Sequence, residues 1–178
     1  MNQDFLDLLR AFIDGNVRFL IVGAYALAVH GRPRATGDLD VWVEATPDNA
    51  AKVMSALEQF GVPTAQVRTE DFSRPGIVFQ MGLPPLRIDV LTELSGLTFS
   101  EAWSTRTRAA FGPVMADVIG REAFIKNKRA SGARGTSGIS RHSASDVHVS
   151  PRVLAQYVGR YVFREGTRAI PEPSLAWF

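Results

Sequence analysis

The sequence predicts a single α/β domain built on a small mixed sheet. The prediction rests on an apolar strand at 17–22 that ends at Gly23, hairpin signals at 76–92 and 106–119, and helical periodicity in three other segments. A chain of 178 residues with 46% apolar content fits one domain with an ordinary core. We expect the helices to pack mainly on one face and the functional site to lie at the edge of the sheet.

The first elements follow from local signals. Residues 3–13 carry apolar side chains at helical spacing, and the strand at 17–22 leads through Gly23 into a short helix at 24–29. A second strand is expected at 38–43. Thr46 and Pro47 then read as the N-cap and first position of a helix that runs to about 60, with a glycine just beyond its end.

The later elements are two hairpins and a closing helix. The β-rich runs at 76–81 and 86–92 are joined by Gly-Leu-Pro-Pro, and those at 106–111 and 114–119 by Gly-Pro. Between the hairpins, Ser100 is expected to cap a short helix that reaches Trp103. A last helix is expected at 121–130.

Composition excludes several classes of protein. The chain has no cysteine, which rules out disulfides and thiolate metal sites, and it has neither a basic signal peptide nor an apolar run of membrane-spanning length. We therefore expect a cytoplasmic protein with no membrane partner. The basic excess lies in the last fifty residues, with seven arginines against three acids from Arg129 onward, so charge alone does not indicate a nucleic-acid partner.

Two aspartates on the second strand are the strongest candidates for chemistry. Asp38 and Asp40 flank Leu39, so on a strand their carboxylates point to the same face. Two adjacent carboxylates repel each other unless a cation or proton lies between them, and oxygen-only ligands suit Mg²⁺ or Mn²⁺. Asp89, in the apolar run RIDVL, is a further carboxylate placed among buried neighbours.

The segment GAYALAVHGRPRATGDLD follows an apolar strand and precedes the run RIDVL. This pattern resembles the nucleotidyltransferase superfamily with the DNA polymerase β-like fold, and within that superfamily it is most similar to the small bacterial AbiEii-type toxins. The resemblance implies that Asp38, Asp40 and Asp89 bind the metal and that Asp89 also deprotonates the acceptor hydroxyl. It implies that Gly23 and Ala24 hold the triphosphate. The family usually has glycine or serine at the position of Ala24, which has no side-chain hydroxyl to donate.

Three further residues are candidates for nucleotide binding. Arg34 and Thr36 lie just before the aspartates and could neutralise or hydrogen-bond phosphate. Lys128, in IKNKRASG, resembles the family's late-helix lysine that approaches the nucleotide, and Lys126 is the weaker candidate of the two.

Each candidate also has a purely structural interpretation. Asp38 and Asp40 could be a solvated pair at a strand end, and Asp89 could form a salt bridge with Arg87 or be an edge-strand charge. Gly23 could serve only as a turn, and the loop residues and lysines could simply face solvent. The histidines form no ligand set.

The segment 132–178 departs from the pattern of the family. It is rich in Ser, Gly and Arg, without periodicity, whereas the family continues with an acidic helix. Read one base out of frame, the codons of 133–143 permit Arg-Ala-Arg-Asp-Leu-Gly-Asp-Ile-Glu-Ala-Leu, which restores that helix. We therefore interpret 1–131 as the nucleotidyltransferase domain and 132–178 as a divergent, frameshifted and poorly packed tail, with a native divergent tail as the alternative.

The function that the sequence favours is metal-dependent transfer of a nucleoside monophosphate from an NTP, such as ATP, to a hydroxyl of tRNA, protein or a small molecule. The resemblance also implies a toxin–antitoxin or phage-defence context, with a cognate antitoxin or toxin as a partner. The alternative is a non-catalytic nucleotidyltransferase-like antitoxin or binding protein. A tail that disrupts the closing helix would impair activity.

Overall fold

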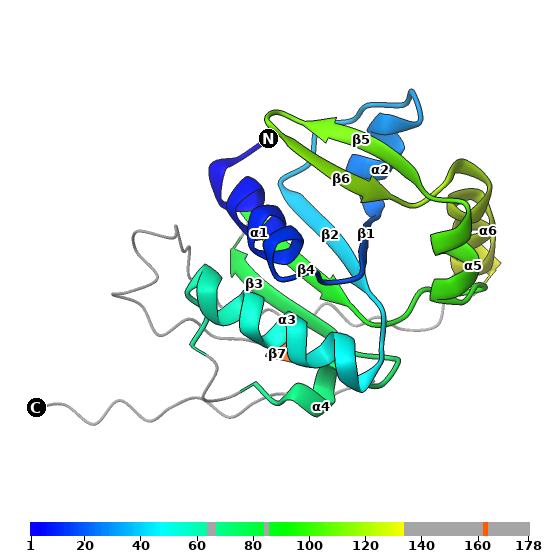
Figure 1. Cartoon of the computed structure of the whole chain (residues 1–178). Coiled ribbons are helices and arrows are strands. Elements are labelled where there is room, and N and C mark those ends of the chain that lie inside the picture. Colours follow the sequence, from blue (N-terminus) through cyan, green and yellow to red (C-terminus); the bar gives the residue numbers. More distant parts are fainter. Residues whose placement is uncertain (64–66, 84–85, 134–161, 164–178) are drawn as a thin grey trace, which may run out of the picture.

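The protein folds around a mixed seven-stranded sheet with the order β5-β6-β1-β2-β4-β3-β7 (Figure 1). A computed structural model describes residues 1–63, 67–83, 86–133 and 162–163. The strands are β1 (Phe19–Ile21), β2 (Asp38–Val43), β3 (Val78–Leu83), β4 (Leu86–Leu91), β5 (Thr107–Phe111), β6 (Val114–Val118) and β7 (Val162–Phe163). The α/β class and the mixed sheet predicted from the sequence are confirmed.

Antiparallel and parallel pairs alternate from β5 to β3, and β7 is antiparallel to β3. β1 is antiparallel to β2 and parallel to β6, while β2 and β4 run parallel. The predicted hairpins are β3–β4 and β5–β6. The parallel pairing of β2 with β4 matters most for function, because it places residues from two distant segments at one level of the sheet.

The helices are α1 (Gln3–Asp14), α2 (Gly23–Val29), α3 (Pro47–Phe60), α4 (Thr69–Phe72), α5 (Phe99–Ser104) and α6 (Arg121–Ala133). The long helices α1 and α3 lie together over one face of the sheet (Figure 1). This face is apolar because Leu39, Val41 and Val43 alternate with the polar positions of β2 and are fully buried. α2 packs against β2 from its other side, where Asp40 approaches Gly23.

Helix ends follow the expected chemistry with one correction. Thr46 caps α3 by accepting a hydrogen bond from the Asn49 N–H, Pro47 occupies the first turn, and Gly61 ends the helix in the left-handed conformation. The prediction that Ser100 caps α5 is wrong. Thr98 is the cap, because its side chain and that of Glu101 satisfy each other's backbone N–H groups in a capping box.

The interpretation of 132–178 falls mostly outside the described residues. Of that segment the structure describes 132–133, which continue α6, and Val162–Phe163, which pair with β3. Within the described ranges, no helix is long and apolar enough to cross a membrane.

Candidate functional site

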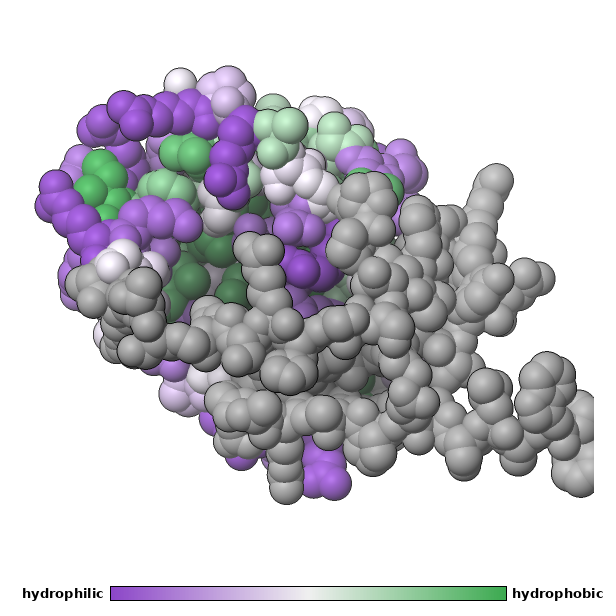
Figure 2. Space-filling view, turned by 180° about the vertical axis from the view of Figure 1, so that it is seen from behind, coloured by the Kyte–Doolittle hydropathy of each residue, from purple (hydrophilic) through white to green (hydrophobic). Residues whose placement is uncertain are grey.

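The register of β2 and β4 brings the three predicted carboxylates to one face of the sheet. Asp40 lies directly opposite Asp89, and Asp38 lies opposite Arg87. Because side chains alternate along a strand, positions 38 and 40 of β2 and 87 and 89 of β4 all point away from α1 and α3. Figure 2 shows the molecule from that side, where hydrophilic and hydrophobic surfaces adjoin in the part not covered by grey.

Asp89 is the most buried of the three carboxylates. Only 7% of the residue is exposed, and Gln80 donates hydrogen bonds from Nε2 to both carboxylate oxygens, at 3.1 and 3.2 Å. Burial raises the pKa of Asp89 to about 6, the neighbouring Asp40 and Asp38 add to the rise, and Arg87 and Gln80 oppose it. In the metal-free protein this carboxyl therefore keeps its proton to a higher pH than an ordinary aspartic acid.

Arg87 bridges two of the aspartates. Its Nε lies 2.9 Å from Asp89 Oδ1, and its Nη2 donates a hydrogen bond to Asp38 Oδ2 at 3.4 Å. The Nε contact is an ion pair without the alignment of a hydrogen bond, since this buried nitrogen has no hydrogen-bond partner. The salt bridge with Arg87, which was the structural interpretation of Asp89, is thus present alongside the predicted convergence of carboxylates.

Asp40 occupies the corner between β2 and the first turn of α2. Its carboxylate lies against Gly23, whose φ of +61° is in the left-handed region. Burial and the charge of Asp38 raise the pKa of Asp40, while Arg87, Lys128 and Arg34 lower it. The structure therefore brings both predicted nucleotide-binding cations, Lys128 and Arg34, within electrostatic reach of Asp40.

Thr36 and Ala24 have local roles that the structure makes visible. The Thr36 hydroxyl accepts a hydrogen bond from the Asp38 N–H at 3.1 Å and donates one to the Asp38 carbonyl at 3.3 Å, so it fixes the backbone at the start of β2. Ala24 is buried in the first turn of α2. That turn begins after Val22 and receives no side-chain cap.

The two lysines of α6 have different surroundings. Lys126 Nζ pairs with Glu101 at 3.2 Å, away from the carboxylates. Lys128 is exposed, with its Nζ 5.4 Å from the centre of the Phe124 ring. Between them, the buried Asn127 donates to the Ser95 carbonyl at 3.0 Å and anchors the helix. Lys128 is therefore the one of the two that remains available to the site.

Sequence reasoning missed Gln80 and the bridging position of Arg87. Gln80 lies opposite Asp89 in the β3–β4 hairpin. The signal that could have found it is a polar residue inside an apolar strand, at the position of the same hairpin that pairs with a buried carboxylate on the other strand. Counting back from the hairpin turn would have paired the two positions.

The donor chemistry of the three aspartates fits a hard divalent cation, because all three offer only oxygen. In this conformation, however, no group of three or more His, Cys, Asp or Glu side chains in the described part of the chain encloses a metal position. The Arg87 guanidinium stands between Asp38 and Asp89, in contact with both. The three aspartates therefore fit Mg²⁺ or Mn²⁺ because they are oxygen donors on one face of the sheet, and the Arg87 guanidinium lies between two of them.

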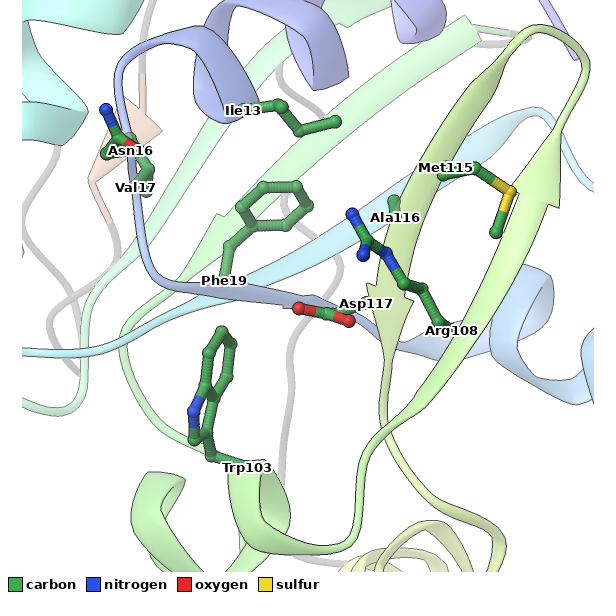
Figure 3. Close-up of a pocket in the computed structure, with 9 residues that line it drawn as sticks. All are labelled: Ile13, Asn16, Val17, Phe19, Trp103, Arg108, Met115, Ala116 and Asp117. Carbon is green, nitrogen blue, oxygen red and sulfur yellow. The ribbon is translucent and has the colours of Figure 1, made fainter.

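A separate cavity of about 200 Å³ lies on the opposite face, between the end of α1, β1, α5 and the β5–β6 hairpin (Figure 3). It contains none of the predicted site residues. Trp103 at its lower end is flanked by the guanidinium groups of Arg18 and Arg106, at 4.8 and 4.1 Å from the ring centre. The lining residues are Ile13, Asn16, Val17, Phe19, Trp103, Arg108, Met115, Ala116 and Asp117.

Comparison with known proteins supports the fold. The chain is similar to the crystal structure of a putative nucleotidyltransferase from Thermotoga maritima, with a TM-score of 0.50 and 17% sequence identity over 75% of this chain and 91% of that one. No family model and no curated protein matches the sequence. The similarity shows that the two chains share a fold.

Proposed function

We propose that this protein is a metal-dependent nucleotidyltransferase that transfers a nucleoside monophosphate from an NTP to a hydroxyl acceptor. The observation that carries the proposal is the register of β2 and β4, which pairs Asp40 with Asp89 and places Asp38 on the same face. A shared fold with the Thermotoga protein agrees with this kind of chemistry.

The three carboxylates would bind the metal, and one of them would also act as the general base. Asp38, Asp40 and Asp89 would hold Mg²⁺ or Mn²⁺, which supplies charge neutralisation and alignment for the transferred phosphoryl group. Asp89, whose carboxylate lies on the same face as the other two, would accept the proton of the attacking hydroxyl. The acceptor oxygen forms a bond to the α-phosphorus as the bond from that phosphorus to the pyrophosphate oxygen breaks, and pyrophosphate leaves.

The nucleotide would lie along the corner formed by Gly23 and Ala24, within reach of Arg34 and Lys128. The Asp40 carboxylate shares that corner and would repel a phosphate, so a cation between them is required. The charges of Arg34 and Lys128, which act on Asp40 in the structure, would offset the remaining phosphate charge. Thr36 acts by fixing Asp38.

We extend the proposal to context on the strength of the AbiEii-type sequence motif. The acceptor is a hydroxyl of tRNA, of a protein or of a small molecule. The protein acts in the cytoplasm as part of a toxin–antitoxin or phage-defence system, with a cognate antitoxin or toxin as its partner.

One observation favours a second candidate, a non-catalytic nucleotidyltransferase-like antitoxin or binding protein. Arg87 already neutralises part of the carboxylate cluster, as in a structural ion-pair network that needs no metal. In that case the three aspartates would hold β2 to β4 and catalyse nothing.

The two candidates are separated by incubating the protein with each radiolabelled NTP, Mg²⁺ and either total tRNA or cell protein. We expect label in an acceptor with wild type, and a loss of at least about 100-fold with Asp38→Asn. Asp117→Asn removes a carboxylate that is also ion-paired, with Arg106, but lines the separate cavity beside Trp103, and should retain activity. Full transfer by Asp38→Asn would refute the catalytic assignment.

A further inference from the structure

We propose that the Arg87 guanidinium partly neutralises the carboxylate cluster before a divalent ion binds, and that it must be displaced when the ion enters. The proposal rests on the proposed function, because it concerns the same site. It assigns to Arg87 a role in setting metal affinity, in place of a purely structural ion pair.

The backbone puts the Arg87 side chain between the acids. Arg87 is two residues before Asp89 on β4, so the two side chains share a face, and it is paired in register with Asp38 on β2. Its guanidinium therefore reaches Asp89 along its own strand at 2.9 Å and Asp38 across the strands at 3.4 Å. A metal ion bound by both of those carboxylates would require the same space.

Charge explains why a cation is needed there. Three carboxylates share this face, and the half-buried Asp40 and the buried Asp89 are driven toward their neutral forms by burial and by repulsion from neighbouring carboxylates. Among the ion pairs of the described residues, those of Arg87 are the ones that reach the cluster. Without Arg87, Asp38 and Asp89 would lose their ion-pair partner, and the cluster would keep the more distant charges of Lys128 and Arg34 and the Gln80 hydrogen bonds.

The contacts of Arg87 suit displacement. Its Nε is buried and makes no hydrogen bond although Asp89 Oδ1 is close, and the Nη2 bond to Asp38 is long. The guanidinium is held mainly by charge, and a divalent ion offers the carboxylates more charge. The side chains of Arg87 and Asp38 are 32% and 41% exposed, so the guanidinium has a route toward solvent.

Competition between Arg87 and the divalent ion predicts the direction in which metal affinity changes when Arg87 is replaced. Removing Arg87 should tighten divalent binding, because the ion no longer has to displace a guanidinium. It should also destabilise the metal-free fold, because Asp38 and Asp89 then lose their ion-pair partner. A merely structural arginine predicts the reverse for binding, since a distorted cluster would bind the ion less well.

The test is Mn²⁺ binding, measured by electron paramagnetic resonance and calorimetry on the full chain, together with thermal unfolding with and without Mg²⁺. We expect Arg87→Gln to bind Mn²⁺ about tenfold more tightly than wild type, which corresponds to the loss of one partly buried ion pair. Its melting temperature should be lower than that of wild type in EDTA and should rise more on addition of Mg²⁺. Arg87→Lys keeps the positive charge on a shorter side chain, so its Mn²⁺ affinity should lie between those of wild type and Arg87→Gln.

Arg106→Gln is the matched control, because Arg106 Nε pairs with Asp117 at 3.2 Å outside the cluster; its Mn²⁺ affinity should equal that of wild type. Suppose that wild type binds Mn²⁺ and that Asp40→Asn abolishes this binding. If Arg87→Gln then binds Mn²⁺ no more tightly than wild type, the role of Arg87 is overturned and the metal site stands. Absence of Asp40-dependent binding in wild type and in Arg87→Gln alike would overturn the proposed metal site itself.

Discussion

The carboxylate of Asp40 lies in the space that a β-carbon on residue 23 would occupy. A Cβ built on Gly23 would meet Asp40 Oδ2 and would stand 2.6 Å from its Cγ. The φ of +61° at Gly23 adds a second restriction, because side-chain-bearing residues rarely adopt it. Two independent constraints therefore require glycine at the point where β1 turns into α2 beside the carboxylate cluster.

Gly23→Ala should disable the site through this contact. The methyl group would push Asp40 out of line with Asp89, so Mn²⁺ affinity and nucleotidyl transfer should both fall by at least about tenfold, with a stability loss of about 1–3 kcal/mol. Binding, transfer and urea unfolding would be measured on the same preparation.

Gly31→Ala is the control for backbone strain alone. Gly31 has a φ of +86°, and a Cβ there would meet nothing within 4 Å. This variant should lose about 1–2 kcal/mol of stability and keep its metal affinity and activity. Equal Mn²⁺ affinity in both glycine variants would show that Asp40 tolerates the methyl group.

Asp89 should make the metal-free protein less stable as pH rises from about 4 to about 6. Its folded pKa of about 6 exceeds the ordinary value of 3.8, so in this window the folded state binds a proton that the unfolded state has released. The stabilisation from Asp89 is thus fully present below the unfolded-state pKa of 3.8 and is lost as the pH rises above the folded-state pKa of about 6. Asp89→Asn, which mimics the protonated acid, should match wild type at pH 4 and exceed it by on the order of 1–3 kcal/mol at pH 7.

The measurement is denaturant unfolding of both proteins in EDTA at a series of pH values. Carboxylates outside the cluster titrate alike in both proteins, so the difference between the two curves reports Asp89 together with its coupling to Asp40 and Asp38. Mg²⁺ added at pH 7 should stabilise wild type and have little effect on Asp89→Asn. A difference that does not change with pH would contradict the raised pKa.

Thr36 should act on Asp38 through the backbone. Thr36→Val keeps the shape of the side chain and removes the hydroxyl that bonds both the N–H and the carbonyl of Asp38. We expect Mn²⁺ affinity to fall by about threefold to tenfold, in line with the loss of one or two hydrogen bonds, and Thr36→Ser to restore it. If Thr36→Val changes only the KM for NTP, the hydroxyl contacts the nucleotide and does not position Asp38.

Asn49 should be a stability determinant with no role in the chemistry. Its buried side chain accepts from the Arg18 N–H at 2.7 Å and donates to the carbonyls of Arg18 and Glu44, at 3.0 and 2.9 Å, which ties α3 to the ends of β1 and β2. Asn49→Ala removes the partner of the Arg18 N–H, whereas the two carbonyls still accept from the Glu44 and Thr46 N–H groups, so it should cost about 1–3 kcal/mol. The neighbouring Asp48, with an 83% exposed side chain, provides the control: Asp48→Ala should cost less than about 1 kcal/mol, and comparable losses in both would contradict the role of Asn49.

Much of the fold is local enough to predict. Thr46, Pro47 and Gly61 mark the two ends of α3 because capping depends on neighbouring residues only. The common face of Asp38 and Asp40 follows from the two-residue period of a strand. Ser100 was mistaken for the cap of α5 because Thr98, two residues earlier, forms the more complete capping box with Glu101.

The arrangement of the site is less local. Neither the hydrogen bonds of Gln80 to Asp89 nor the contact of Arg87 with Asp38 was predicted, since both depend on the register between strands. The pairing of Asp40 with Asp89 likewise joins positions far apart in the chain. The sequence identified the acids and a possible Arg87–Asp89 salt bridge, but not that Arg87 also reaches Asp38.

By itself, the sequence determined which residues can carry the chemistry: a glycine after a buried strand, two aspartates on one face, and a third in a later apolar strand. The tertiary structure decided that β2 and β4 run parallel with Asp40 opposite Asp89, and that Arg87 occupies the middle of the cluster. The physical reason is that side-chain alternation is a property of each strand alone. Register and charge compensation between strands arise only when the whole sheet is assembled.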